Sequence, residues 1–132
     1  MSEKSQRRAV STDAAPAAIG PYSQGIVCGD LLFVSGQLPI DPASGDLVAG
    51  SIEEKTRRVI ENIRAIAAAA GASLDDVVKT TVFLKDMSDF GAVNTVYEET
   101  FPTTPPARAA IQVAALPKDA DIEIEAIVHL PD

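Results

Sequence analysis

The feature that most constrains the fold is an amphipathic segment that begins at Ser51 and ends at Gly71. Ser51 is followed three residues later by Glu54, a pair typical of a helix N-terminus, and Gly71 is typical of a helix end. Between them, apolar residues recur at helical spacing: Val59, Ile60, Ile63, Ile66, Ala67 and Ala70. Because such a helix must bury its apolar face, the rest of the chain has to supply a second layer.

The segments around this helix predict that the second layer is a β-sheet. Residues 26–28 and 31–35 are short apolar runs that flank Gly29-Asp30, a pattern typical of a β-hairpin. Further strands are expected at residues 77–85, 108–114 and 121–130.

A second helix is predicted over residues 88–100, with Phe90, Val93 and Tyr97 on its apolar side. The proline-rich segment 101–106 cannot continue it. Two amphipathic helices can cover only one face of the sheet, so the sequence predicts an α+β two-layer domain with both helices on one face.

The 132 residues are enough for one domain, and 46% of them are hydrophobic. Residues 1–15 are polar, small and charged, and we expect them to form a flexible N-terminal tail. Residues 16–132 are expected to form the single α+β domain.

The charge and the cysteine count exclude several functions. A net charge of −8 argues against nucleic acid and anionic membranes as partners. One cysteine, Cys28, and one histidine, His129, cannot make a disulfide framework or a zinc site from protein ligands alone. No apolar stretch has the length of a membrane span, so we expect a cytoplasmic protein.

The uncovered face of the sheet has a mixed character. Alternation in the last strand turns apolar residues toward the helices: Ile122, Ile124, Ala126, Val128 and Leu130. It turns Glu123, Glu125, Ile127 and His129 the other way. In the preceding strand Ile111 and Val113 are expected to meet the helices, so Arg108, Ala110 and Gln112 should share the uncovered face with Glu123. Such a face suits an oligomer interface or a site.

Arg108 and Glu123 are the principal candidates for chemistry. The arginine could hold a substrate carboxylate through two parallel hydrogen bonds, or it could form a surface or interface ion pair. Glu123 could be a general acid or base if apolar neighbours partly bury it, or it could be a solvated strand residue.

Three other places could contribute to a site. Tyr22 lies in a loop fixed by Gly20, Pro21 and Gly25, where it could bind a ligand or pack its ring under the loop. The pair Ser35-Gly36 ends a strand and either admits a ligand to the backbone or forms a bend. In the second predicted helix, Asn94 could orient a substrate or a loop, or face solvent. We interpret Cys28 as a small core residue and His129 as structural or solvent-facing.

Seven segments, taken in order, resemble the RidA/YjgF family of enamine/imine deaminases. They are AAIGPYSQG at 17–25, VSGQLP at 34–39, VKTTVFL at 78–84, FGAVN at 90–94, PAR at 106–108, LPKDA at 116–120 and IEIEA at 122–126. The resemblance implies a chorismate-mutase-like fold and a homotrimer, in which the sheets surround a central barrel and the sites lie between subunits.

The resemblance also implies a reaction and a set of residues. The reaction is hydrolysis of 2-aminoacrylate, through 2-iminopropionate, to pyruvate and ammonia, with no metal or organic cofactor. Arg108 matches the residue that grips the substrate carboxylate, and Glu123 the one that positions or activates water. The remaining substrate-binding positions correspond to Tyr22, Ser35, Gly36, Asn94 and Ala110.

One departure from the family pattern leaves other functions open. Ala109-Ala110 stands where relatives often carry Ser-Cys, so a mechanism that needs that thiol does not transfer to this chain. The resemblance also allows a non-enzymatic trimer that acts as a chaperone-like or regulatory ligand-binding protein. A ribonuclease follows from names given to relatives, although the acidic balance disfavours it.

Overall fold

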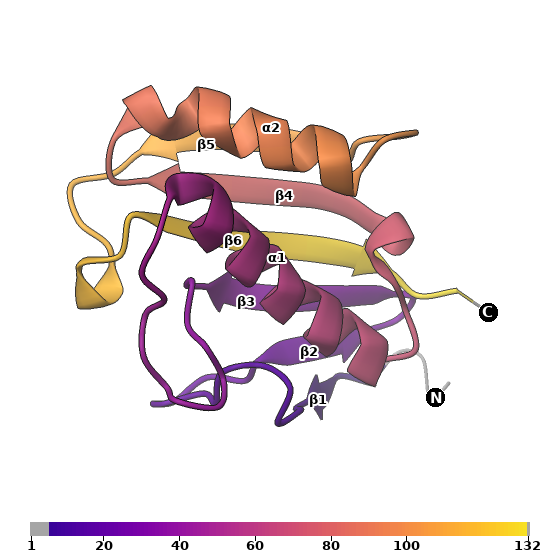
Figure 1. Ribbon diagram of the computed structural model, residues 1–132. Helices are drawn as coiled ribbons and strands as arrows, with labels where there is room; N and C mark the ends of the chain where they lie inside the picture. The colour runs from indigo at the N-terminus through magenta and orange to yellow at the C-terminus, as the bar shows by residue number, and fades with distance from the viewer. Residues whose placement is uncertain (1–5, 132) are drawn as a thin grey trace.

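The computed structural model describes residues 6–131 as a six-stranded sheet with two helices on one face (Figure 1). The strand order is β1-β2-β3-β6-β4-β5, and only β4 and β5 run parallel. The strands are β1 Arg8–Val10, β2 Gly25–Cys28, β3 Leu31–Gln37, β4 Val77–Leu84, β5 Ala107–Gln112 and β6 Ile122–His129. The helices are α1 Ile52–Ala69 and α2 Phe90–Thr100, with short 3₁₀ turns at Leu74–Asp76, Met87–Asp89 and Pro117–Asp119. The predicted α+β class, with both helices on one face, is confirmed.

Helix α1 begins and ends where the sequence predicts. The Ser51 hydroxyl accepts a hydrogen bond from the Glu54 backbone N–H at 3.1 Å, and Gly71 adopts a φ of +84° just beyond the helix end. The apolar face packs onto the sheet. Its buried residues include Val59, Ile60, Ile63, Ile66 and Ala67.

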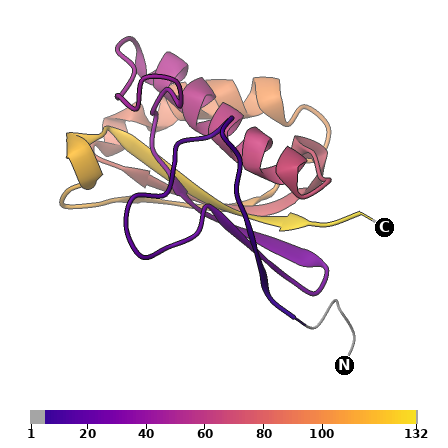
Figure 2. The ribbon, with the colours of Figure 1, turned by 90° about the horizontal axis from the view of Figure 1, so that it is seen from below.

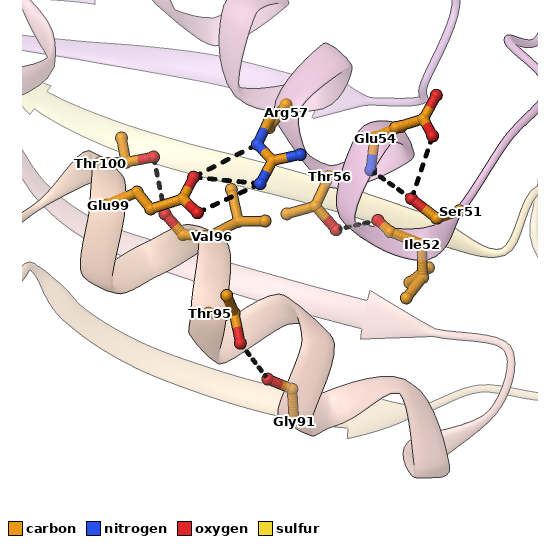
Figure 3. A network of polar contacts seen from close by, with 10 residues as sticks. All are labelled: Ser51, Ile52, Glu54, Thr56, Arg57, Gly91, Thr95, Val96, Glu99 and Thr100. Atoms are coloured by element: carbon orange, nitrogen blue, oxygen red, sulfur yellow. Dashed lines mark hydrogen bonds and ion pairs between the residues drawn. The ribbon is translucent and has the colours of Figure 1, made fainter.

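The two helices lie side by side over the sheet and are joined on their solvent side by an ion pair. Arg57 of α1 donates hydrogen bonds of 3.1–3.2 Å to the carboxylate of Glu99 in α2 (Figure 3). Both side chains are about half exposed, so this contact contributes little to stability. The buried contact between each helix and the sheet therefore holds the layers together.

The N-terminal segment is more ordered than the sequence predicts. Arg8–Val10 form strand β1, which pairs antiparallel with β2, and Val10 and Ala15 are buried. The buried Gln24 side chain binds the backbone of residues 12–16 through four hydrogen bonds. The expectation of a flexible tail is thus wrong for residues 8–15, because one buried amide and a strand pairing compensate for their polar composition. Residues 1–5 of the predicted tail lie outside the described residues.

Within residues 6–131, both helices lie on the same side of the sheet, and no helix covers the opposite, open face (Figure 2). In β6 the predicted alternation is confirmed: Ile122, Ile124, Ala126 and Val128 are buried under the helices, whereas Glu123, Glu125, Ile127 and His129 lie on the open face.

In β5 the predicted phase of the alternation is wrong by one residue. Ile111 lies opposite Phe83 and is 46% exposed, so it belongs to the open face. Arg108 and Ala110 lie opposite the buried residues Thr80 and Val82, on the helix side. The prediction placed Ile111 in the core because it is the largest apolar side chain of the strand. However, β5 is an edge strand, and the Arg108 side chain covers part of α2 instead.

Cys28 was expected in the core, yet its side chain is exposed. It follows the buried Val27 in β2, so strand alternation turns it toward the open face. His129 is also exposed on that face, as one of its two predicted interpretations states. Within residues 6–131 no helix is long and apolar enough to cross a membrane.

Candidate functional site

Arg108 lies at the beginning of β5, and its side chain reaches across to helix α2. The central guanidinium carbon lies 4.9 Å from the ring centre of Phe90 and 4.8 Å from that of Tyr97. One Nη atom donates a hydrogen bond of 2.8 Å to the Asn94 side-chain oxygen. We call Phe90, Asn94, Tyr97 and Arg108 the Arg108 cluster. It brings together two of the predicted site residues, Arg108 and Asn94.

The three helical members of this cluster share one stripe of α2. Phe90, Asn94 and Tyr97 follow each other at spacings of four and three residues, so their side chains line up along the helix. Two π faces and one amide oxygen all attract a cation. The stripe therefore suits a guanidinium, and the proline-rich segment between α2 and β5 returns the chain so that Arg108 meets it.

The positive charge of Arg108 has no acidic partner among residues 6–131. It borders an open groove of about 520 Å³. The lining residues are Asn94, Tyr97, Glu98, Phe101, Pro102, Pro105, Pro106 and Arg108. An unneutralised guanidinium at the edge of a partly apolar groove has the chemistry to bind a small carboxylate.

Glu123 lies on the other face of the sheet, in β6, opposite Phe83 of β4. It fits tightly against Gly36: a Cβ atom built at residue 36 would lie only 2.0 Å from a carboxylate oxygen of Glu123. The pairing of β3 with β6 shifts register between Val34 and Gln37, which creates this close approach. A larger residue at position 36 would therefore displace the Glu123 carboxylate.

The surroundings of Glu123 favour a proton on its side chain. Partial burial raises the pKa of the Glu123 carboxyl above its ordinary value, and the nearby carboxylate of Glu125 raises it further. A raised pKa brings a glutamate closer to the range in which it can both accept and donate a proton. Glu123 is therefore suited to acid–base chemistry.

Ser35 connects the Glu123 region to the loop that carries Tyr22. Its hydroxyl donates a hydrogen bond of 2.5 Å to the Ser23 carbonyl, and its backbone N–H donates to the Gln24 carbonyl. Tyr22 is 53% exposed, so its ring does not pack under the loop. We call Ser35, Gly36 and Glu123 the Glu123 cluster, with Tyr22 on the adjoining loop.

The predicted site residues thus form two groups on opposite faces of one sheet. The Arg108 and Glu123 backbones are two strand spacings of about 4.8 Å apart across the sheet and three residues of about 3.3 Å apart along it, which gives a diagonal distance of about 14 Å. The expectation that these two side chains share a face is wrong. Ala110 lies on the Arg108 side, partly buried against the core.

Sequence reasoning missed two groups of residues that shape the site. Phe90 and Tyr97 were assigned only to the apolar side of the second helix, although their spacing with Asn94 indicates a common stripe. Gln24, whose side chain binds the backbone of residues 12–16 ahead of the Tyr22 loop, carried no recognisable signal. In the described part of the chain, no group of three or more acidic, histidine or cysteine side chains could hold a metal ion.

Comparison with known proteins agrees with this architecture. The family model described as endoribonuclease L-PSP matches residues 12–130. A RutC family protein of Pyrococcus abyssi is 55% identical over 123 residues, which cover 93% of this chain and 97% of that protein. A goat protein named 2-iminobutanoate/2-iminopropanoate deaminase is 54% identical over 121 residues, which cover 92% and 88%. A solved structure of a Rid family protein from Yersinia pestis is 44% identical with a TM-score of 0.92, covering 95% of this chain and all of that one (100%). The chain therefore belongs to the RidA/YjgF family.

Proposed function

We propose that this protein hydrolyses small enamine and imine intermediates of the 2-aminoacrylate/2-iminopropionate type to 2-oxo acids and ammonia. One observation carries the proposal: Arg108 is held by two rings and an amide, yet has no acidic partner among the described residues. An arginine that is fixed but not neutralised is suited to a substrate carboxylate. The deaminase name of the goat relative supports the same reaction.

In the proposed mechanism, Arg108 pairs with both carboxylate oxygens of the imino acid. Two parallel hydrogen bonds fix the direction in which the neighbouring imine carbon points. Ring contacts hold the guanidinium without neutralising it, so its charge remains available to the substrate. The imine carbon is already electrophilic, so correct placement supplies much of the catalysis.

Glu123 then assists the water. Its carboxylate accepts a proton from water as the oxygen adds to the imine carbon, and Glu123 then returns that proton to the imine nitrogen. The resulting carbon bears one hydroxyl and one amino group. Glu123 then takes the proton of the hydroxyl group and passes it to the amino group, so that the C–N bond breaks, ammonia leaves and the 2-oxo acid remains.

These roles require two copies of the chain, because one chain holds Arg108 and Glu123 on opposite faces of its sheet. We therefore propose a homotrimer in which the Arg108 cluster of one subunit faces the Glu123 cluster of the next. The open face supports association, since large apolar side chains are exposed on it: Leu31 36%, Phe33 43% and Ile111 46%.

The testing experiment measures pyruvate and ammonia released from freshly generated 2-aminoacrylate, compared with the spontaneous rate. We expect both products to form faster in proportion to enzyme concentration. A protein that binds pyruvate or 2-oxobutanoate but does not accelerate release would be a ligand-binding trimer instead. RNA cleavage that persists through further purification and disappears with Arg108→Ala would favour the ribonuclease named by the family model.

A further inference from the structure

The support beneath Arg108 extends beyond the residues that touch it. Tyr97, whose ring lies 4.8 Å from the guanidinium carbon, is buried, with only 7% of its surface exposed. Its hydroxyl lies 2.8 Å from the hydroxyl of Thr80, which is buried to 3% exposure. Thr80 is also the residue of β4 that lies directly opposite Arg108 in β5. One buried hydrogen bond therefore ties the ring under Arg108 to the strand beside Arg108.

We propose that Thr80, Tyr97 and Phe90 are positioning residues for Arg108: Thr80 fixes the Tyr97 ring, and the two rings fix the guanidinium. The inference rests on the proposed role of Arg108 as the carboxylate anchor. Asn94 accepts a hydrogen bond from one N–H group of the guanidinium. The ring contacts occupy none of the remaining N–H donors, whereas an acidic partner would occupy them. The cluster thus holds the cation in place and keeps its hydrogen-bonding capacity for the substrate.

The alternative is that Thr80 and Tyr97 only fill the core. Tyr97 does pack against Phe101, with ring centres 5.4 Å apart, and Thr80 belongs to a buried face of β4. A purely structural role would lower stability without changing how Arg108 binds an anion. A positioning role changes anion binding even when the fold is intact, so the two roles differ in one measurable quantity.

The test measures binding of 2-oxobutanoate, a carboxylate that resembles the proposed products, by titration calorimetry. Thr80→Val and Tyr97→Phe each remove the same hydrogen bond and keep the shape, so each should weaken binding and the double variant should be no weaker than the worse single one. Tyr97→Leu also removes the ring and should weaken binding further, by about twofold to thirtyfold. Ile63→Ala in α1 is the matched control: it removes buried core volume away from Arg108 and should leave the Kd unchanged.

A second readout observes Arg108 directly. The guanidinium lies near two rings, so the NMR signal of its Nε–Hε group should shift strongly in Tyr97→Leu and Phe90→Leu. The signal should shift less in Thr80→Val and should not shift in Ile63→Ala. An Arg108 signal that does not move in Tyr97→Leu or Thr80→Val would overturn the inference.

The binding data separate this inference from the proposed function. If the wild-type protein binds 2-oxobutanoate and Thr80→Val and Tyr97→Leu bind it equally well, positioning is wrong while the carboxylate anchor stands. If the wild-type protein does not bind it, the anchor is wrong, and the positioning inference fails with it. Weaker binding of 2-oxobutanoate by Thr80→Val and Tyr97→Leu, together with an unchanged Kd for Ile63→Ala, would support the inference.

Discussion

At the scale of single residues, the positive charge of Arg108 is held in place without being neutralised. Arg108 is fixed by π faces and an amide, whereas Arg57 and Arg64 pair with the carboxylates of Glu99 and Glu61. A guanidinium that already has an acid partner gains little from a substrate carboxylate, because its charge and its N–H fork are occupied. The difference in partners explains why Arg108 is suited to binding.

Arg108→Lys should abolish most deaminase activity and leave the oligomer intact. Lysine keeps the charge but loses the planar fork that pairs both carboxylate oxygens, so it no longer fixes the imine carbon. The loss of a charge-assisted hydrogen bond, about 1.5–3 kcal/mol, corresponds to about tenfold to over a hundredfold in rate. Pyruvate release and light scattering measure the two quantities. Arg57→Lys, in the exposed ion pair between the helices, is the matched control and should keep full activity.

Near-complete activity of Arg108→Lys would mean that no bidentate clamp exists. A variant that falls apart into monomers would instead make Arg108 an interface residue.

Glu125→Gln should extend activity to lower pH. The negative charge of Glu125 is one cause of the raised pKa of Glu123, so removing that charge lowers the Glu123 pKa. Glu123 acts as a base only when ionised, and a lower pKa keeps it ionised further into the acid range. The acid limb of the kcat/KM profile should therefore move to lower pH, while Glu53→Gln, on α1, should leave it in place. An acid limb that stays at the same pH or moves to higher pH in Glu125→Gln would show that Glu123 is not the titrating base.

Ala110→Cys should change activity by less than about tenfold, or roughly 1.4 kcal/mol of barrier. The side chain of residue 110 lies on the same face as Arg108, so the variant restores the thiol that relatives often carry there without disturbing the anchor. Steady-state pyruvate release measures the effect. A far larger gain would indicate that the native chain is an impaired catalyst and would favour the ligand-binding role.

At the scale of helices and strands, sequence patterns predicted where most elements lie, but they predicted less well which face of the sheet each side chain occupies. The capped, periodic segment 51–71 and the alternating strand 121–130 lie within a few residues of α1 and β6, because local spacing alone defines them. Strand β1 was missed since its order depends on pairing with β2 and on the distant Gln24 side chain. In β5 the alternation was right but its phase was wrong, because the partner of Arg108 is a helix that no local pattern reveals.

Ser51→Ala should lower the free energy of unfolding by about 1 kcal/mol, since it removes the side-chain cap of α1. Arg57→Ala removes three hydrogen bonds drawn in the same view, yet should cost no more than about 0.5 kcal/mol, because that ion pair is exposed (Figure 3). Urea denaturation at one fixed protein concentration measures both. The reverse order of effects would mean that the contact between α1 and α2, rather than the cap, stabilises the helix.

At the scale of the whole molecule, one sheet separates the two halves of the proposed site. The helix side carries Arg108 and the open side carries Glu123, with about 14 Å between their backbones. Sequence reasoning named both residues and placed Glu123 on the correct face, but it placed Arg108 on the wrong one. The proposed reaction needs both residues at one substrate, so the proposal includes association of at least two chains.

Mixing two inactive variants tests the central claim most directly. Arg108→Ala and Glu123→Gln are unfolded together, refolded at equal amounts into mixed trimers, and assayed for pyruvate release. If each site takes Arg108 from one subunit and Glu123 from the next, about a quarter of the sites in a random mixture regain both residues, so about a quarter of wild-type activity should return. Each variant refolded alone should remain inactive. Mixed trimers, verified by native mass spectrometry, that show no activity would contradict a site shared between subunits.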